Sequence, residues 1–492
     1  MSSIDAAILA AEREVEAASR SRSICAAPLV RDAAPIDSLL PPGHEDSAGD
    51  LLAPPPAASA LDDAGIELRQ HALTAYAGKP AHHEPAPIPP FLVGSWKMFT
   101  ATKINLMLVF LPLGIAAELL EWSDGAIFGL NCLAILPLAK LLGDATEQVA
   151  THTNDTIGGL LNATFGNATE LIVSVFALVK GLLDVVQVSL LGSIISNTLL
   201  VLGMACIAGG ITKPVQKFNS TAASANTTLL LMSILGMSIP ACLAGFGEMK
   251  VNGKEDLLIS RFTAIVLLFL YCLYIYFQLV THRKYFEAEP EVPGGARTPV
   301  LARGAQQPAL QLQSHVTRAG SSSFIMHKTD EEEEILFTLS GALFWLGSIT
   351  VVIAFLSEFL TGAIEGATKD YSINKSFVGF VILPIVGNAA EHATAITMAY
   401  KSKMDLALGV ALGSATQISL FVVPFMVLTG WAIGQPLDLF FGAYETAITF
   451  VATVVVGFAV ADGETNWLEG ASLLSAYIII GASFLFYEHK SE

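Results

Sequence analysis

Apolar runs of about 20 residues follow one another from Lys103 onward, and they restrict the possible folds of this chain more than any other feature. Each run is long enough to cross a bilayer core of about 30 Å as a helix. The chain is 53% hydrophobic and only 14% charged, whereas a soluble domain carries about 25% charged residues. We therefore expect an all-α polytopic membrane protein.

Eleven runs can be distinguished, which predicts eleven transmembrane helices. They cover residues 104–120, 124–142, 155–180, 185–208, 221–245, 259–281, 335–361, 371–399, 404–430, 437–460 and 467–487. Only one interior gap between runs is long, and it ends in an acidic stretch formed by Asp330, Glu331, Glu332, Glu333 and Glu334. Such a stretch is usually a solvated surface, and the alternative is a regulatory segment that senses cytosolic cations.

Five parts of the chain follow from this pattern. We predict a disordered N-terminal tail over residues 1–100, a first transmembrane helix over 101–123 and a five-helix unit over 124–281. A cytosolic linker over 282–334 then leads to a second five-helix unit over 335–492. The tail is rich in Ala, Pro, Asp and Glu, a composition typical of disorder. No cleavable signal peptide is expected, and the first span would act as the membrane signal.

Two near copies of one motif lie within apolar runs: Gly166-Asn167-Ala168-Thr169-Glu170 and Gly387-Asn388-Ala389-Ala390-Glu391. A Gly-Ser pair follows each copy at the same interval, as Gly192-Ser193 and Gly413-Ser414. The constant offset of 221 residues pairs Glu170 with Glu391, and Ser196 with Gln417. This is an internal repeat.

The number of spans between the two copies predicts their relative orientation. The first copy lies on the third span and the second on the eighth, so the copies would enter the membrane from opposite faces. The expected architecture is one helix plus two inverted five-helix repeats. Many secondary transporters are built in this way and bind their substrate near the midplane.

The motif residues predict a cation site. A charged carboxylate at the bilayer centre costs about 2.5 kcal/mol or more, so Glu170 and Glu391 are candidate functional residues. Glycine followed by asparagine within a span lowers helix propensity and lets the backbone open. Oxygen atoms from Asn167, Asn388 and the two carboxylates are hard ligands of the kind that Ca²⁺ prefers. The alternative role of Gly166 and Gly387 is close helix packing.

Paired carboxylates also favour exchange of Ca²⁺ for protons. Two ionised carboxylates in one site repel each other, so protons and Ca²⁺ compete for them. If the site can switch between the two sides of the membrane only with Ca²⁺ or protons bound, the protein is an antiporter. His392 either shares in the proton movement or is a structural hydrogen-bond partner. Ser196 and Gln417 either complete the site or form interhelical hydrogen bonds.

Other classes of protein are less consistent with the sequence. The five cysteines are scattered, which indicates neither a disulfide framework nor a metal cluster. A net charge of −18 argues against nucleic acid as a partner. Enzyme motifs such as HExxH or Gly-x-Ser-x-Gly are absent from the sequence, and no cofactor is expected beyond the transported Ca²⁺ and protons. A cation channel could use the same glutamates for selectivity. The lipid bilayer is an expected partner, and the sequence leaves open whether the protein forms a homo-oligomer.

Basic residues favour a cytosolic N-terminus. With that orientation, eight basic residues fall on the cytosolic side: Lys97, Lys103, Lys213, Lys217, Arg283, Lys284, Lys401 and Lys403. Five lysines fall on the other side: Lys180, Lys250, Lys254, Lys369 and Lys375. The long linker would then be cytosolic.

The motif segments resemble the CAX family of calcium/proton exchangers. The matching segments are residues 162–173, 192–197, 384–393 and 413–418, and the resemblance extends over about residues 100–487. It implies eleven spans, an acidic segment between the sixth and seventh, Glu170 and Glu391 as ligands shared by Ca²⁺ and protons, and residence in the membrane of an acidic vacuole or similar organelle. The glutamine at position 417 resembles the residue found there in the proton-coupled branch of the family. Exchange of Mn²⁺, or coupling to Na⁺, is the alternative within this class. The long tail and the short acidic run depart from the family pattern.

Overall fold

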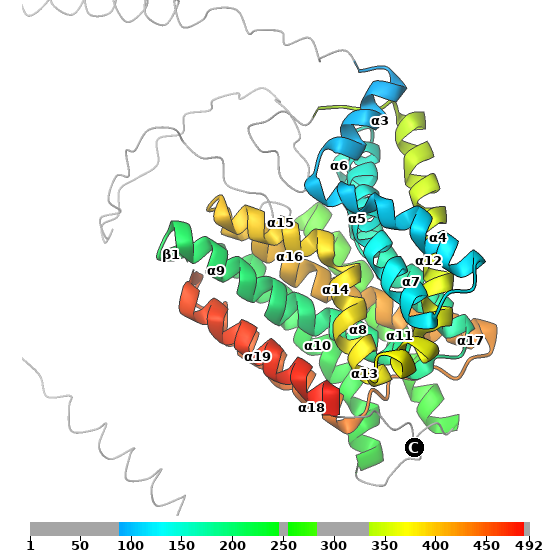
Figure 1. The fold of residues 1–492 in the computed structure, drawn as a ribbon. Coiled ribbons are helices and arrows are strands. Elements are labelled where there is room, and N and C mark those ends of the chain that lie inside the picture. Colours follow the sequence, from blue (N-terminus) through cyan, green and yellow to red (C-terminus); the bar gives the residue numbers. More distant parts are fainter. Residues whose placement is uncertain (1–87, 246–253, 283–333, 487–492) are drawn as a thin grey trace, which may run out of the picture. The chain divides into compact units, whose positions relative to one another are not determined.

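The computed structural model describes residues 88–245, 254–282 and 334–486, and most of them are helical (Figure 1). The helices before the long linker are α3 (Phe91–Thr100), η1 (Lys103–Val109), α4 (Phe110–Leu119), α5 (Asp124–Ala150), α6 (Asp155–Phe165), α7 (Ala168–Val179), α8 (Leu183–Ile195), η2 (Ser196–Val201), α9 (Leu202–Thr212), α10 (Ser220–Gly245), α11 (Lys254–Tyr276) and η3 (Phe277–Thr281). Those after it are α12 (Leu339–Asp370), α13 (Lys375–Phe377), η5 (Val378–Ile382), α14 (Leu383–Gly387), α15 (Ala389–Tyr400), α16 (Met404–Gln417), η6 (Ile418–Val422), α17 (Val423–Ile433), α18 (Ala443–Ala459) and α19 (Trp467–Phe486).

The lengths and composition of these helices fit a membrane protein. Within the described ranges, seven helices are long and apolar enough to cross a bilayer, or up to ten when each of three bent helix pairs is taken as one span. Helix α18 is a further apolar helix of 17 residues. The helical membrane class expected from hydropathy is therefore confirmed.

Several boundaries differ from those predicted. Helix α3 occupies the last ten residues of the region predicted to be a disordered tail, because Phe91 packs against Phe337 and Trp345. Helix α5 continues to Ala150 and α12 to Asp370, since a helix can extend beyond its apolar run into polar turns. The span predicted to begin at residue 437 begins at Ala443. Most of the tail, the linker and the acidic residues Asp330 to Glu333 lie outside the described residues.

A two-stranded antiparallel sheet was not predicted. Strand β1 (Val215–Lys217) pairs with β2 (Glu464–Asn466) and joins the connection after α9 to the connection before α19. An ion pair of 2.7 Å between Lys217 and Glu464 adds to the pairing. Three residues per strand are too few for a period of two to be recognised in the sequence.

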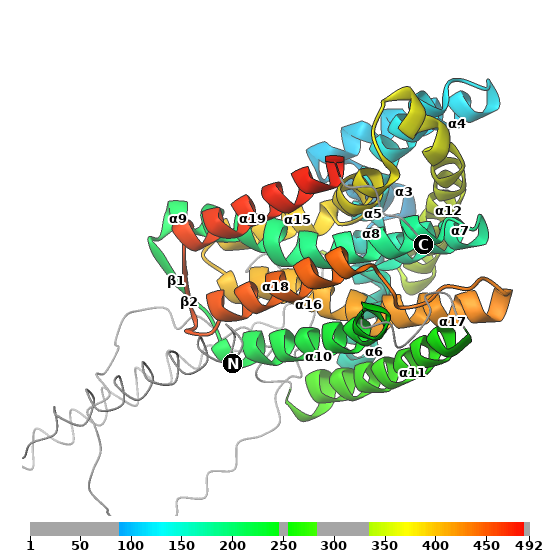
Figure 2. The same cartoon turned by 90° about the horizontal axis from the view of Figure 1, so that it is seen from below.

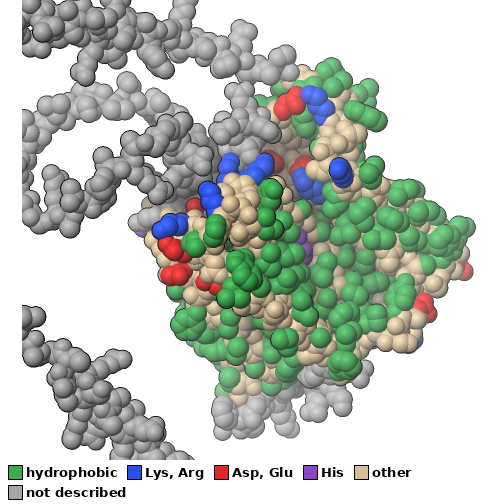
Figure 3. All heavy atoms as spheres, turned by 60° about the vertical axis from the view of Figure 1, so that its left-hand side comes forward, with side chains coloured by type: hydrophobic (Ala, Val, Ile, Leu, Met, Phe, Trp, Pro, Cys, Tyr) green, Lys and Arg blue, Asp and Glu red, His purple; other side chains and the backbone are tan. Residues whose placement is uncertain are grey.

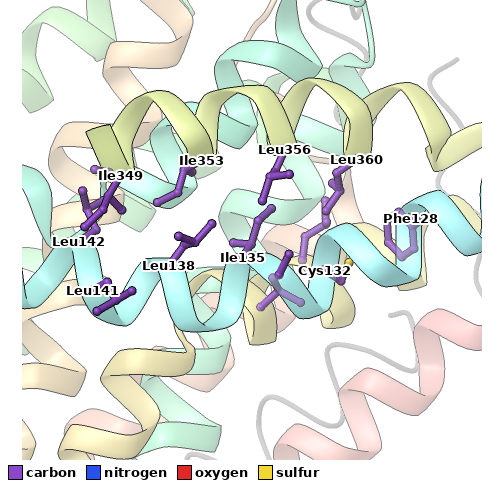
Figure 4. Close-up of a cluster of buried hydrophobic side chains, with 14 of the residues drawn as sticks. Phe128, Cys132, Ile135, Leu138, Leu141, Leu142, Ile349, Ile353, Leu356 and Leu360 are labelled. Carbon is purple, nitrogen blue, oxygen red and sulfur yellow. The ribbon is translucent and has the colours of Figure 1, made fainter. Parts of the chain in front are cut away.

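Helices α5 and α12 form the largest apolar contact that positions the site. Leu138, Ile135, Ile353, Leu356 and Leu360 point toward one another between these helices (Figure 4). All five are almost fully buried. Removing such a side chain from a close-packed core typically costs about 2–5 kcal/mol, so this pair is a rigid frame.

Two further groups of helices pack beside this frame. Helices α9, α15, α16 and α19 run side by side (Figures 1 and 2). Helices α10, α11 and α17 enclose another apolar core together with α8. These contacts join the parts of the chain before and after the linker into one helical body.

Many large apolar side chains are exposed on the surface. Hydrophobic side chains cover much of the face in Figure 3, and charged side chains gather mainly toward one end of that face. Large exposed apolar residues include Phe262, Phe269, Val451 and Ile479. Exposed apolar area of this extent is typical of a lipid-facing or protein-binding surface.

The two Gly-Ser pairs give a matched test of packing. A Cβ atom at Gly192 would lie 2.3 Å from the Phe380 carbonyl oxygen, whereas nothing lies within 4 Å of one at Gly413. We expect Gly192→Ala to destabilise the protein by about 1–3 kcal/mol, since overpacking forces backbone to move. Gly413→Ala should be neutral or slightly stabilising. Thermal unfolding of the purified proteins tests this, and equal midpoints for the two variants would contradict the close approach.

Candidate functional site

Both Gly-Asn pairs break a helix. Helices α6 and α7 bend by 46° across Gly166-Asn167, and the segment 375–387 bends by 58° against α15 at Asn388. Each asparagine is the N-cap of the following helix, with backbone angles outside the helical range. The break follows from the low helix propensity of both residue types. It places Glu170 and Glu391 in the first turns of α7 and α15.

The two motifs meet in space. A Cβ atom at Gly387 would lie 2.5 Å from Oε1 of Glu170, so the glycine of the second motif leaves room for the carboxylate of the first. The Glu170 and Glu391 carboxylates also interact electrostatically with each other. Glu170 is only 7% exposed. Two glutamates that are far apart in sequence therefore share one buried site.

Side-chain hydrogen bonds connect the motifs to the helices that follow them. Asn167 donates from Nδ2 to Oε1 of Gln417 at 2.8 Å. The Ser414 hydroxyl donates to Oδ1 of Asn167 at 3.1 Å and accepts from Nδ2 of Asn197 at 3.0 Å. The Glu391 carboxylate also lies beside Asn197 and Ser414, where the Asn197 amide can donate to it. The network therefore surrounds the paired glutamates.

Ser196 and His392 form a second contact between the two halves. Oγ of Ser196 lies 3.3 Å from Nε2 of His392, and Ser196 is fully buried. His392 directly follows Glu391 along α15. The contact fits either role that the sequence suggested for His392, as a structural partner or as a participant in proton movement.

Ser196 and Gln417 both lie where an α-helix changes to a π-helix. Ser196 begins η2, and Gln417 is the last residue of α16 before η6. Segments of π-helix occur frequently at functional sites because they redirect side chains. The two residues paired by the sequence repeat thus occupy similar positions in two helices.

Several oxygen atoms in this region have no hydrogen-bond partner within the described residues. They are Oε1 and Oε2 of Glu170, Oε2 of Glu391, Oδ1 of Asn388 and Oδ1 of Asn197. Buried polar atoms are normally satisfied, and unpaired carboxylate oxygens are especially costly to bury. A cation or protons would satisfy this set.

A small cavity lies beside Glu170. Thr169, Ser174, Ser189, Ser193 and Gly387 contribute to its lining, together with apolar residues of α5, α12 and α14. Within the parts of the chain that are described, no group of three or more His, Cys, Asp or Glu residues could hold a metal ion. The site instead combines two carboxylates with amide and hydroxyl oxygens, which suits a hard cation.

Ser414 is a site residue that sequence reasoning did not identify. The repeated Gly-Ser pairs were visible, but they served only to align the two copies. Their serines face the site: Ser414 bridges two asparagines, and Ser193 lines the cavity. A polar residue next to a glycine at matching positions of both repeats is the signal that would have found them.

Broken apolar helices around paired, buried carboxylates define a multi-pass membrane protein with a polar site in its interior. The chain belongs to the sodium/calcium exchanger protein family, whose model matches residues 124–280 and 341–486.

Relatives and a solved structure agree with this assignment. Vacuolar cation/proton exchanger 2 of Oryza sativa subsp. japonica is 43% identical over 385 residues, which are 78% of this chain and 81% of that protein. The vacuolar calcium ion transporter of Schizosaccharomyces pombe is 41% identical over 398 residues, covering 80% of this chain and 88% of that protein. The structure of native YfkE has a TM-score of 0.61 and 31% identity, covering 78% of this chain and all of that one.

Proposed function

We propose that this protein is a secondary active antiporter that exchanges cytosolic Ca²⁺ for protons from the lumen of an acidic organelle. The observation that carries the proposal is the set of unpartnered Glu170 and Glu391 oxygens in one buried site. The relatives named above support it, since one is a vacuolar cation/proton exchanger and another a vacuolar calcium ion transporter. A vacuolar or similar membrane is the proposed location.

In the proposed cycle, Glu170 and Glu391 bind either Ca²⁺ or protons. Ca²⁺ takes about six to eight oxygen ligands, and Asn167, Asn388 and Gln417 would add amide oxygens to the carboxylates. When Ca²⁺ leaves, the two carboxylates repel each other and take up protons. The carboxylates are satisfied only when Ca²⁺ or protons are bound, so the protein changes its facing only with the site occupied. The result is exchange of the two ions and not a leak of either one. His392 would assist the proton step beside Ser196.

For the architecture, we infer eleven spans in the arrangement of one helix plus two inverted repeats. The seven long helices, the three bent pairs and the short apolar helix α18 together add up to eleven. The two motif helices break at corresponding residues, and both later helices contain a π-helical segment. An inverted repeat commonly supports alternating access around a central site. We propose a cytosolic N-terminus on the basis of the lysine distribution.

Uptake of ⁴⁵Ca²⁺ by proteoliposomes tests the proposal. With an acidic interior, we expect Ca²⁺ accumulation that a protonophore abolishes, because protons leaving the vesicle drive Ca²⁺ entry. Uptake that is indifferent to the pH gradient but responds to a sodium gradient would favour Na⁺ coupling. Conductive Ca²⁺ flux that needs neither gradient would favour a channel. Competition by Mn²⁺ measures selectivity, since Mn²⁺ also accepts hard oxygen ligands.

A further inference from the structure

Two buried aspartates form a pair apart from the cation site. Asp256 lies in the first turn of α11, and Asp438 lies in the connection 434–442 between α17 and α18. Their exposed fractions are 1% and 3%. The two side chains are joined by a hydrogen bond. An ionised carboxylate has no proton to donate, so this bond exists only when the pair holds a proton.

The Asp438 carboxyl group is otherwise only partly satisfied. Its Oδ1 accepts from Nε2 of Gln187 at 2.8 Å and from the backbone N–H of Phe440 at 3.0 Å. Its Oδ2 is buried and has no N–H or hydroxyl donor in the described part of the chain. When the Asp256 carboxyl group holds a proton, it can donate that proton to Asp438.

The connection 434–442 is built into the core instead of lying on the surface. Leu437, Leu439 and Phe441 are buried among residues of α8, α10 and α11. The backbone N–H of Leu439 donates to Oγ of Ser260 on α11 at 3.0 Å. The Gln187 amide on α8 also reaches the Asp438 carbonyl oxygen at 3.3 Å. The acid pair therefore contributes to holding α8, α11 and this connection together.

No basic side chain neutralises Asp438 within the described residues, where it forms no ion pair. Among the described residues, the other charged groups at this end of the neighbouring elements are Asp184 on α8, Lys254, Glu255 and Arg261 on α11, and Glu445 on α18. The Arg261 guanidinium lies 4.9 Å from the centre of the Trp431 ring. Among the described residues, a proton is thus the available counter-charge for the Asp438 carboxyl group.

The electrostatic environment agrees with proton binding near neutral pH. Burial, followed by the nearby Asp256 carboxyl group, raises the pKa of Asp438 from its usual 3.8 to about 7. A carboxyl group whose pKa is higher in the folded state adds stability at low pH and loses it as the pH rises through the folded value. Stability from this pair should therefore fall as the pH rises toward and past 7.

We propose that Asp256 and Asp438 form a second proton-binding site, separate from the Glu170–Glu391 site, which fastens the connection 434–442 to α8 and α11 when it is protonated. Helix α8 also carries Ser193, which lines the cavity beside Glu170. If the N-terminus is cytosolic, as proposed above, the pair faces the organelle lumen. Only the role of the lumen depends on this orientation. An acidic lumen would then keep the pair protonated and the connection 434–442 attached to α8 and α11.

The test uses the full chain with Glu170→Gln and Glu391→Gln as background, so that the cation site does not titrate. In calcium-free buffer, infrared spectroscopy follows the carboxylic acid band from pH 5.5 to 8.5. We expect a band that disappears with a midpoint near 7, and Asp438→Asn should remove it. Asparagine keeps an acceptor for Gln187 and donates permanently to Asp256, so the fold is retained. Glu255→Gln, an exposed neighbour in α11, is the matched control.

Thermal unfolding of the same proteins gives a second readout. The unfolding temperatures of the background protein and of Glu255→Gln should fall between pH 6 and 8. The unfolding temperature of Asp438→Asn should change little over the same range. Asp256→Asn serves the same purpose if Asp438→Asn does not fold. An unchanged band or an unchanged pH dependence in the asparagine variants would overturn the proposal. Ca²⁺ that restores stability at pH 8 only when both aspartates are present would also overturn it, by indicating a cation site.

Discussion

Glu391→Gln and Glu170→Gln are each expected to reduce proton-driven Ca²⁺ uptake to about 4% of the unmodified protein or less. Each change removes a charged ligand from a buried site and leaves an amide that does not exchange protons at neutral pH. A loss of charge from a buried, hydrogen-bonded set typically costs about 2–5 kcal/mol, and every 1.4 kcal/mol is about tenfold in affinity. ⁴⁵Ca²⁺ uptake into acidic proteoliposomes measures the effect.

Glu365→Gln is the matched control for these variants. Glu365 is an exposed carboxylate near the end of α12 and pairs with Lys375 at 2.5 Å, so its loss should leave uptake close to normal. Such exposed pairs contribute only about 0–1 kcal/mol. All variants should be compared at equal amounts of protein in the vesicles. Full-rate exchange by either site variant would rule out a mechanism in which both glutamates are shared by Ca²⁺ and protons.

Gly387→Ala is expected to lower Ca²⁺ uptake by about tenfold or more while the protein stays folded. The new methyl group would occupy a position 2.5 Å from Oε1 of Glu170. That oxygen is at the end of a flexible side chain, so the carboxylate moves and the backbone need not. The carboxylate would then be displaced from its position as a ligand, and cation binding would weaken. A tenfold loss of affinity corresponds to about 1.4 kcal/mol of binding free energy.

Gly409→Ala in α16 provides the comparison, because nothing lies within 4 Å of a Cβ atom at that position. It should transport normally and unfold at a similar temperature. The apparent KM for Ca²⁺ should rise in Gly387→Ala, since the defect is in ligand position. If Gly387→Ala transports like Gly409→Ala, Glu170 does not occupy the space beside Gly387 in the working protein. A loss of folded protein would point to packing as the role of this glycine.

Hydropathy and motif spacing predicted a large part of the fold. The apolar runs identified the helical membrane class, because burial in lipid depends on the composition of each segment by itself. Gly166-Asn167 and Gly387-Asn388 also marked the helix breaks, since helix propensity is a property of a few neighbouring residues. The limits of the helices were less accurate, as the early helix α3 and the late start of α18 illustrate.

Most of the connections around the candidate site could not be predicted. The hydrogen bond from Asn167 to Gln417 joins residues 250 positions apart, and that from Asn197 to Ser414 joins residues 217 apart. The repeat suggested that Gln417 belonged with the motifs, but it did not reveal Ser414 as the bridge. Which polar side chains meet depends on how the helices cross, and crossing angles leave no local pattern in the sequence.

Local sequence patterns are enough to predict a multi-span helical protein with two glutamates in broken apolar segments, because each of these properties follows from the order of neighbouring residues. That Gly387 makes room for Glu170 and that Asp256 is paired with Asp438 is visible only in the folded protein, because these contacts depend on how distant helices pack. In the sequence, Asp438 lies in the apolar run predicted as a span over residues 437–460. In the fold it lies in a connection, and it acquires its chemistry from burial beside a second carboxyl group on another helix.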